Sequence, residues 1–189
     1  MYHISNDKRS KESSGWIFDA LERLMEKKRF ENISITDVCK EAKIGRVTFY
    51  RHYDTLEDVL RKKSDELFEE FIPYCKDYNQ RKTSGSGLLV PFLRYWYVNP
   101  KIIQLIIQAD KTYILTDSIN RLISISKLLP LKEHNIDLEE DSYFSAVVNS
   151  VILCILIEWI KKGQNLAPDD LAERILTKMK KTIESNTFI

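Results

Sequence analysis

Residues 33–60 read ISITDVCKEAKIGRVTFYRHYDTLEDVL, and this stretch decides the fold of the chain. Two short segments with apolar residues at helical spacing, 35–42 and 46–53, are separated only by Lys43-Ile44-Gly45. Two short helices joined by a tight turn that contains glycine form a helix-turn-helix. The apolar residues that would pack the two helices together are Val38, Ala42, Ile44 and Phe49. The pattern therefore predicts a helix-turn-helix over residues 35–53.

The outward face of the second helix carries residue types that suit a DNA duplex. An arginine such as Arg46 can bind a guanine edge, and Val47 or Thr48 can contact a thymine methyl or a hydrogen-bond acceptor. Tyrosine, histidine and threonine side chains suit phosphate contacts, which position the duplex without reading its sequence. The predicted DNA contacts are Thr36, Gly45, Arg46, Val47, Thr48, Tyr50, Arg51 and His52.

Composition predicts an all-α protein with a local basic patch. The 189 residues include only 5 Gly and 5 Pro, which suits long helices better than the turn-rich sequence of an all-β protein. The net charge of +1 means that nucleic-acid binding must come from a local patch. Residues 38–52 provide one, because a single acid, Glu41, stands among four basic side chains: Lys40, Lys43, Arg46 and Arg51.

Apolar periodicity and capping residues predict helices along the whole chain. Pro73 is expected to kink or end the fourth helix, Gly163 to follow the eighth, and RKTSGSG at 81–87 to be a linker. The predicted helices are 10–29, 35–42, 46–53, 56–79, 88–98, 100–109, 112–129, 138–162 and 168–185.

Several classes of protein are disfavoured by the sequence. The three cysteines, Cys39, Cys75 and Cys154, are far apart, which favours core thiols in a reducing cytoplasm over a disulfide framework. The polar N-terminus does not resemble a signal peptide, and the apolar stretch 146–157 is too short to cross a bilayer. No HExxH, Walker A or GxSxG motif and no metal-ligand spacing is present, so we expect no enzyme, cofactor or metal.

Residues 33–60 resemble the DNA-binding domain of the TetR/AcrR family. That family has an alanine closing the second helix, a valine or isoleucine in the turn, and then a Thr-Phe/Leu-Tyr-x-His/Tyr-Phe run. The residues that hold these places here are Ala42, Ile44, Thr48, Phe49, Tyr50, His52 and Tyr53. The resemblance implies a cytoplasmic transcriptional regulator, typically a repressor that binds a palindromic operator as a homodimer and is released by a small-molecule effector.

The resemblance also implies a division of the chain. Residues 1–55 would form the helix-turn-helix domain with its N-terminal arm, and residues 56–189 a helical regulatory and dimerisation domain, with helix 56–79 connecting the two. Family members dimerise through their last two long helices, which correspond to 138–162 and 168–185. No membrane association is expected.

Three departures from the family pattern concern DNA affinity. Leu56 stands where the family usually has a phosphate-binding lysine, Lys43 and Gly45 replace the usual glycine and serine of the turn, and Asp54 adds a negative charge. Basic residues elsewhere could compensate by contacting phosphate, and the candidates are Lys8, Arg9 and Lys11 of the arm together with Arg51.

The effector site is the least specific prediction. Aromatic side chains in the second part of the chain could line a ligand pocket or could simply form the core, because both environments are apolar. The candidates are Phe92, Tyr95, Trp96, Tyr113 and Trp159. Two alternatives to a ligand-responsive regulator stay open at this point: a protein-interaction module or co-activator on the same scaffold, and a DNA-binding protein with no ligand.

Overall fold

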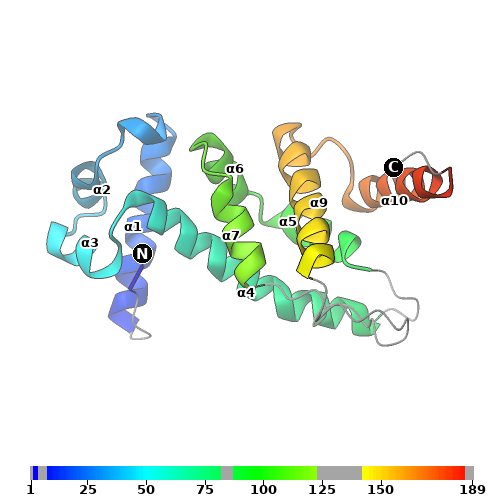
Figure 1. Cartoon of the computed structure of the whole chain (residues 1–189). Helices are drawn as coiled ribbons and strands as arrows, with labels where there is room; N and C mark the ends of the chain where they lie inside the picture. The colour runs from blue at the N-terminus through cyan, green and yellow to red at the C-terminus, as the bar shows by residue number, and fades with distance from the viewer. Residues whose placement is uncertain (1, 4–7, 82–86, 123–141, 186–189) are drawn as a thin grey trace. The chain divides into compact units, whose positions relative to one another are not determined.

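The computed structural model describes residues 2–3, 8–81, 87–122 and 142–185 (Figure 1). Within these ranges the regular structure is helical, apart from one isolated antiparallel bridge between Tyr2 and Tyr53. The all-α prediction is confirmed. The described residues form two compact units: those within 1–68 and 101–122 belong to unit 1, and those within 69–100 and 123–189 belong to unit 2. The units are defined by packing and not by function, so the predicted boundary between a DNA-binding domain (1–55) and a regulatory domain (56–189) stays a prediction.

Unit 1 is built around α1, whose apolar stripe is covered by the helices that follow it. Ile17, Ala20 and Leu21 of α1 are fully buried, and α1 packs against both α2 and α3. Because α2 and α3 are too short to be stable alone, this shared core holds them in place. The elements of unit 1 are α1 (Lys8–Met25), a 3-10 helix (Phe30–Asn32), α2 (Ile35–Glu41), α3 (Arg46–His52), the first part of α4 (Leu56–Arg81), α6 (Lys101–Gln108) and α7 (Tyr113–Leu122).

Ion pairs and hydrogen bonds attach α6 to α1. Lys101 lies 2.9 Å from a carboxylate oxygen of Glu22, and the Gln108 amide donates to the backbone carbonyl of Met25 at 2.8 Å. On the other side of α6, Ile103 and Ile106 are fully buried. Residues far from the helix-turn-helix in sequence therefore belong to the same packed unit.

The helix α4 begins at a cap and continues through its proline. The Thr55 hydroxyl accepts from the Asp58 backbone N–H at 3.2 Å, and the Asp58 carboxylate accepts from the Thr55 N–H at 3.0 Å. Of the two effects expected of Pro73, a kink or an end to the helix, the structure rules out the end, because α4 runs on to residue 81. Pro73 and Glu69 are both exposed, so water can solvate the carbonyl that the missing proline N–H leaves without a donor.

Unit 2 consists of the second part of α4 with α5 (Leu89–Val98), α9 (Ser142–Lys161) and α10 (Pro168–Glu184). The α5 helix packs against both α9 and α10. Arg94 of α5 forms a bidentate ion pair with Asp169 of α10, with N–O distances of 2.9 and 2.7 Å. The Trp159 indole N–H donates to the Leu166 carbonyl at 3.1 Å. Gly163 follows α9 with φ +68°, the left-handed conformation expected after a helix end.

Some sequence predictions fall outside the described residues or fail. Three parts of the predictions lie outside the described ranges: residues 82–86 of the linker predicted at 81–87, the predicted helix beyond residue 122, and the predicted helix start at 138–141. Cys39 and Cys75 are buried as expected, and burial raises the pKa of the Cys75 thiol to about 11. Cys154 is exposed on the single chain, so its assignment as a core thiol was wrong.

Candidate nucleic-acid interface

The start of α2 is fixed by a reciprocal cap. The Ser34 hydroxyl accepts from the Asp37 backbone N–H at 3.1 Å, and the Asp37 carboxylate accepts from the Ser34 N–H at 3.0 Å. This capping box satisfies two backbone donors that a helix start leaves free. The hydrogen bonds from Ser34 hold the pKa of the Asp37 carboxyl below its usual value, with Lys28 nearby contributing less.

The turn between α2 and α3 is closed by two backbone hydrogen bonds. The Lys43 N–H donates to the Lys40 carbonyl at 3.2 Å, and the Ile44 N–H donates to the Cys39 carbonyl at 3.0 Å. This pairing is that of a Schellman motif, in which the residue after the helix cap takes a left-handed conformation. Lys43 is that residue, with φ +56°. A Cβ added to Gly45 would meet nothing within 4 Å, so the start of α3 is open to a close partner.

Replacing Lys43 with glycine is expected to stabilise the protein by about 0.5–1 kcal/mol, because glycine adopts positive φ without a steric penalty. Urea denaturation of the purified chain measures the change. Lys40→Gly is the matched control, since Lys40 is an exposed lysine in a right-handed turn of α2 and the same substitution there should destabilise by about 1 kcal/mol. Equal effects of the two substitutions would contradict a strained Lys43.

The two faces of α3 are sharply different. Phe49 is fully buried, whereas Val47 is 84% exposed and Tyr50 is 45% exposed. The guanidinium carbon of Arg46 lies 5.8 Å from the centre of the Tyr50 ring, and its Nη2 atom lies 3.5 Å from the Tyr50 hydroxyl. Arg46 and Tyr50 stand one turn apart on the helix, so they present a planar cation and a phenol side by side.

The structure brings together most of the residues that the sequence predicted for DNA contact. Six of them are exposed and Thr48 is half-buried; the exposed ones are Thr36, Gly45, Arg46, Val47, Tyr50 and Arg51. His52 is the exception, because its side chain is only 2% exposed and its Nδ1 atom lies 3.4 Å from the Ser10 hydroxyl. The buried imidazole cannot reach a phosphate in this structure, so we remove His52 from the candidate interface.

The charge of this surface is more positive than the sequence alone indicates. Glu41, the single acid among residues 38–52, accepts a 2.8 Å hydrogen bond from Arg23, which holds the pKa of its carboxyl below the usual value. Asp54 lies 3.4 Å from the His3 imidazole. Leu56 is half-buried at the start of α4, where the family usually has a lysine. Lys8, Arg9 and Lys11 are exposed at the start of α1.

Comparison with known proteins identifies the fold. No model of a known protein family matches the chain. A solved TetR transcriptional regulator from Streptococcus agalactiae superposes with a TM-score of 0.60 at 22% identity, covering 89% of this chain and 93% of that one. This chain has the TetR fold. The resemblance predicted from residues 33–60 is thereby confirmed, and the TetR-like architecture extends through both units.

Further matches are another solved structure and two curated regulators of the helix-turn-helix type. The protein Lin0861 from Listeria innocua superposes with a TM-score of 0.77 at 24% identity, covering 94% of each chain. The dhaKLM operon transcriptional activator DhaS of Lactococcus lactis is 31% identical over 97 residues, or 51% of this chain and 50% of DhaS. The biofilm operon negative regulator IcaR of Staphylococcus epidermidis is 26% identical over 93 residues, or 49% of this chain and 50% of IcaR. The chain spans about half the length of these curated relatives, which regulate with opposite signs.

The TetR-like structure separates the five aromatic residues that the sequence predicted for a ligand pocket. Four of them lie in unit 2 and are buried: Phe92, Tyr95, Trp96 and Trp159. The Phe71 ring packs against two of them, at 5.4 Å from Phe92 and 5.5 Å from Tyr95, and burial raises the pKa of the Tyr95 phenol. Tyr113 lies in unit 1 and donates a hydrogen bond to Glu57. Their role in ligand binding stays a prediction.

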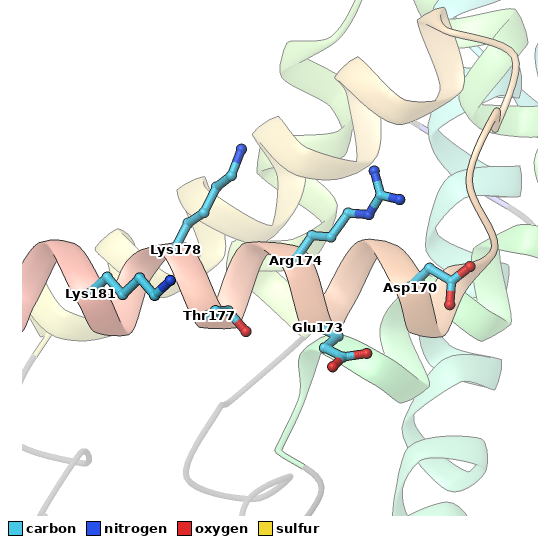
Figure 2. A pocket seen from close by; sticks show the side chains of 6 residues that line it. All are labelled: Asp170, Glu173, Arg174, Thr177, Lys178 and Lys181. Atoms are coloured by element: carbon cyan, nitrogen blue, oxygen red, sulfur yellow. The ribbon is translucent and has the colours of Figure 1, made fainter.

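A hollow on α10 has a different character. Figure 2 shows the six side chains that line it, all projecting from this one helix. Two are acidic and three are basic, and the set is Asp170, Glu173, Arg174, Thr177, Lys178 and Lys181. A site lined by one polar helix face is open to solvent and lacks the apolar walls that small-molecule pockets have. We therefore interpret it as a solvated face.

Sequence reasoning missed the residues that contact the helix-turn-helix from outside it. Arg23 neutralises Glu41, and Tyr2 and His3 lie beside the end of α3. Each of these contacts joins residues at least 18 positions apart, as the Arg23–Glu41 pair illustrates. A lone tyrosine or arginine far from the motif carries no spacing signal that would have revealed it.

Proposed function

We propose that this chain is a sequence-specific DNA-binding transcriptional regulator that binds a palindromic operator as a homodimer. The observation that supports the proposal most directly is the exposed face of α3, where Arg46, Val47 and Tyr50 point away from a helix anchored by buried Phe49. A helix presented in this way can enter the major groove, where arginine binds guanine and valine contacts a thymine methyl. The TetR fold of the chain supports the same function.

The remaining side chains of the interface suit the DNA backbone. Three exposed side chains can contact phosphates on either side of the groove: Thr36 at the start of α2, Lys43 in the turn and Arg51 near the end of α3. Because Arg23 pairs with Glu41, the negative charge of Glu41 is balanced, and the electrostatic potential of this surface favours a polyanion such as DNA. Binding should therefore weaken steeply as salt concentration rises.

A homodimer accounts for apolar surface that the single chain leaves exposed. On α9, Tyr143 is 86% exposed and Val147 57% exposed, and no charged residue occurs between positions 142 and 157. On α10, Leu176, Met179 and Ile183 are also exposed. Exposed apolar side chains that form patches mark protein interfaces. A second copy using the same two helices would cover them and would give the two-fold symmetry that a palindrome requires.

The full length of α9 bears on the expectation that the apolar stretch 146–157 is too short to cross a bilayer. By length and composition alone, the longer segment Tyr143–Lys161 could cross a membrane, so the shortness of the stretch 146–157 does not exclude a span. The α9 helix extends beyond the apolar stretch 146–157 in both directions. Its face toward α5 is already buried in protein, where Leu153, Leu156 and Trp159 are at most 3% exposed. We propose that a second copy, rather than lipid, covers the remainder.

Cys154 provides a direct probe of this dimer. It lies two turns after Val147 on the same face of α9 and is the exposed cysteine of the single chain. We expect the wild-type dimer to react slowly with a thiol reagent at all three cysteines, and Val147→Arg to produce a monomer with one fast thiol. Sedimentation gives the oligomeric state, and adding Cys154→Ser to Val147→Arg should remove the fast phase. A wild-type dimer that labels rapidly at Cys154 would show that this face of α9 stays free.

Selection of bound duplexes from a random pool, with the purified full-length chain at physiological salt, tests the proposal. We expect enrichment of a palindrome whose half-sites lie about one helical turn, roughly 34–36 Å, apart. Loss of that enrichment in Tyr50→Ala would link it to the exposed face of α3. A folded dimer that enriches no sequence would contradict the proposal.

A second candidate function follows from one observation. Leu56 places an apolar, half-buried side chain where the family usually has a phosphate-binding lysine, which favours contact with a protein over contact with DNA at that point. The scaffold would then act as a protein-interaction module or co-activator. The variant Leu56→Lys restores the charge and discriminates between the DNA-binding regulator and the interaction module. If the wild type retains no duplex and Leu56→Lys retains it strongly, the interaction module is supported.

A further inference from the structure

The N-terminal residues Tyr2 and His3 are paired with the C-terminal end of α3. Tyr2 forms an antiparallel bridge with Tyr53, the residue that caps α3, and the His3 N–H donates to the His52 carbonyl at 2.8 Å. The last carbonyls of a helix have no partner within it, so this donor satisfies one of them. The His3 imidazole also lies 3.4 Å from Asp54. Tyr2 and His3 thus contact three consecutive residues at the C-terminal end of α3: His52, Tyr53 and Asp54.

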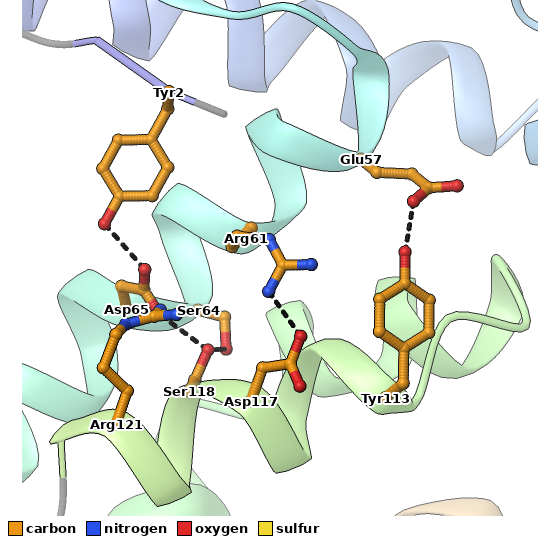
Figure 3. Close-up of polar contacts among 9 residues, drawn as sticks. All are labelled: Tyr2, Glu57, Arg61, Ser64, Asp65, Tyr113, Asp117, Ser118 and Arg121. Atoms are coloured by element: carbon orange, nitrogen blue, oxygen red, sulfur yellow. Dashed lines mark hydrogen bonds and ion pairs between the residues drawn. The ribbon is translucent and has the colours of Figure 1, made fainter.

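The Tyr2 side chain extends this contact to α4. Its hydroxyl donates to Oδ2 of Asp65 at 2.7 Å, and the Lys62 ammonium lies 5.6 Å from the centre of its ring (Figure 3). Asp65 is 1% exposed, and a buried carboxylate is unfavourable unless several donors satisfy it. The Tyr2 hydroxyl is one of those donors, so the position of Tyr2 and the burial of Asp65 depend on each other.

The other oxygen of Asp65 is bound from α7. The Ser118 hydroxyl donates to Oδ1 at 2.6 Å and the Arg121 guanidinium donates to it at 2.5 Å, while Ser64 donates to Ser118 at 3.1 Å. Figure 3 shows Tyr2 approaching Asp65 from one side while Ser118 and Arg121 approach from α7. Asp65 is therefore a junction where the N-terminal residues, α4 and α7 meet.

Two further contacts along α4 and α7 fix the register of the pair. Arg61 binds Asp117 at 2.8 Å and Glu57 accepts from Tyr113, so that residues four apart on α4 face residues four apart on α7. A shift of one turn in either direction would place like charges opposite each other, Arg61 against Arg121 or Asp65 against Asp117. The α7 helix is thus held in one register on α4, and a displacement of α7 must act on Asp65.

We propose that Tyr2 is a positioning residue for DNA binding, which couples the C-terminal end of α3 to α7 through Asp65. The inference rests on the proposed DNA-binding function and deepens it by naming a route of regulation within unit 1. When Ser118 and Arg121 hold Asp65, Tyr2 has a fixed acceptor and the His3–His52 pairing keeps the end of α3 in place. Weakening the α7 contacts frees the Tyr2 hydroxyl and loosens α3.

Hydrogen exchange and DNA binding of Tyr2→Phe test the proposal. Phenylalanine keeps the ring and the backbone bridge and removes only the hydroxyl. We expect backbone amides of residues 49–55 to exchange about 3- to 10-fold faster, amides of residues 89–98 in unit 2 to be unchanged, and duplex affinity to fall by a similar factor. Tyr97→Phe is the matched control, because Tyr97 is a half-exposed tyrosine of unit 2 and its substitution should change neither readout.

Ser118→Ala supplies the coupling test from the α7 side. It removes one donor to Asp65 and should also speed exchange in residues 49–55, and the double variant with Tyr2→Phe should show less than the product of the two effects. Exchange does not require DNA, so the positioning of α3 is measured even if the wild type binds no duplex, a result that would refute the proposed function alone. Unchanged exchange at residues 49–55 in Tyr2→Phe overturns the proposal. If the wild type binds the duplex, faster exchange in Tyr2→Phe without any loss of duplex affinity overturns it as well.

Discussion

Replacing Phe49 with alanine is expected to lower the free energy of unfolding by about 3–5 kcal/mol. The Phe49 side chain is fully buried, and its ring lies 5.8 Å from that of Tyr53 and 5.7 Å from that of Tyr50. Alanine would leave a cavity between α3 and the α1 stripe, which two helices of seven residues each can fill only by losing their packing. Urea denaturation followed by far-ultraviolet circular dichroism measures the loss.

Val47→Ala is the matched control, because Val47 lies two residues from Phe49 on the opposite face of α3 and is 84% exposed. Its truncation removes no buried contact, so stability should stay within about 0.5 kcal/mol of the wild type. The same variant should change the preferred operator, since a valine methyl can contact a thymine methyl. A stability loss below about 1 kcal/mol for Phe49→Ala would mean that α3 does not depend on this core.

The starts of α2, α3 and α4 and the end of α9 could be predicted because their signals are local. Ser34 and Asp37, or Thr55 and Asp58, stand three residues apart and form caps with each other, and Gly163 supplies its own left-handed conformation. Such signals need no knowledge of distant contacts, so the starts of α2, α3 and α4 agree with the sequence. The outward and inward faces of α3 followed from the same local spacing, because a residue's direction on a helix depends only on its position.

What the sequence could not predict depends on contacts between distant segments. His52 was expected to face DNA, but its imidazole is buried beside Ser10 and its carbonyl accepts from the His3 N–H, and both partners stand more than 40 positions earlier in the sequence. Tyr113 was grouped with the aromatic residues of unit 2, but its helix belongs with α4. The burial of Asp65 depends on donors 53 or more positions away, and no periodicity in the sequence encodes such a junction.

The second large effect is expected from Arg46→Ala, which should weaken binding to the selected operator by roughly 10- to 100-fold, the range for losing one good arginine–guanine contact. Arg46 is exposed and is steadied by the Tyr50 ring, so its guanidinium is available to a base edge without rearrangement of α3. Specificity should relax at one base pair of each half-site. Affinities of operator variants changed one pair at a time measure this effect.

Substitutions of Arg51 and Arg29 distinguish sequence-specific base contacts from non-specific electrostatic attraction. Arg51→Ala should weaken binding to all duplexes alike and reduce the slope of affinity against salt by about 1 per subunit, as a phosphate contact would. Arg29 pairs with Glu31 at 2.7 Å and lies in the loop before α2, so Arg29→Ala should change neither property. If Arg46→Ala instead lowered affinity equally for operator and random duplex, the exposed face of α3 would be attracting DNA without reading it. The enriched palindrome would then have to be recognised through its shape and deformability.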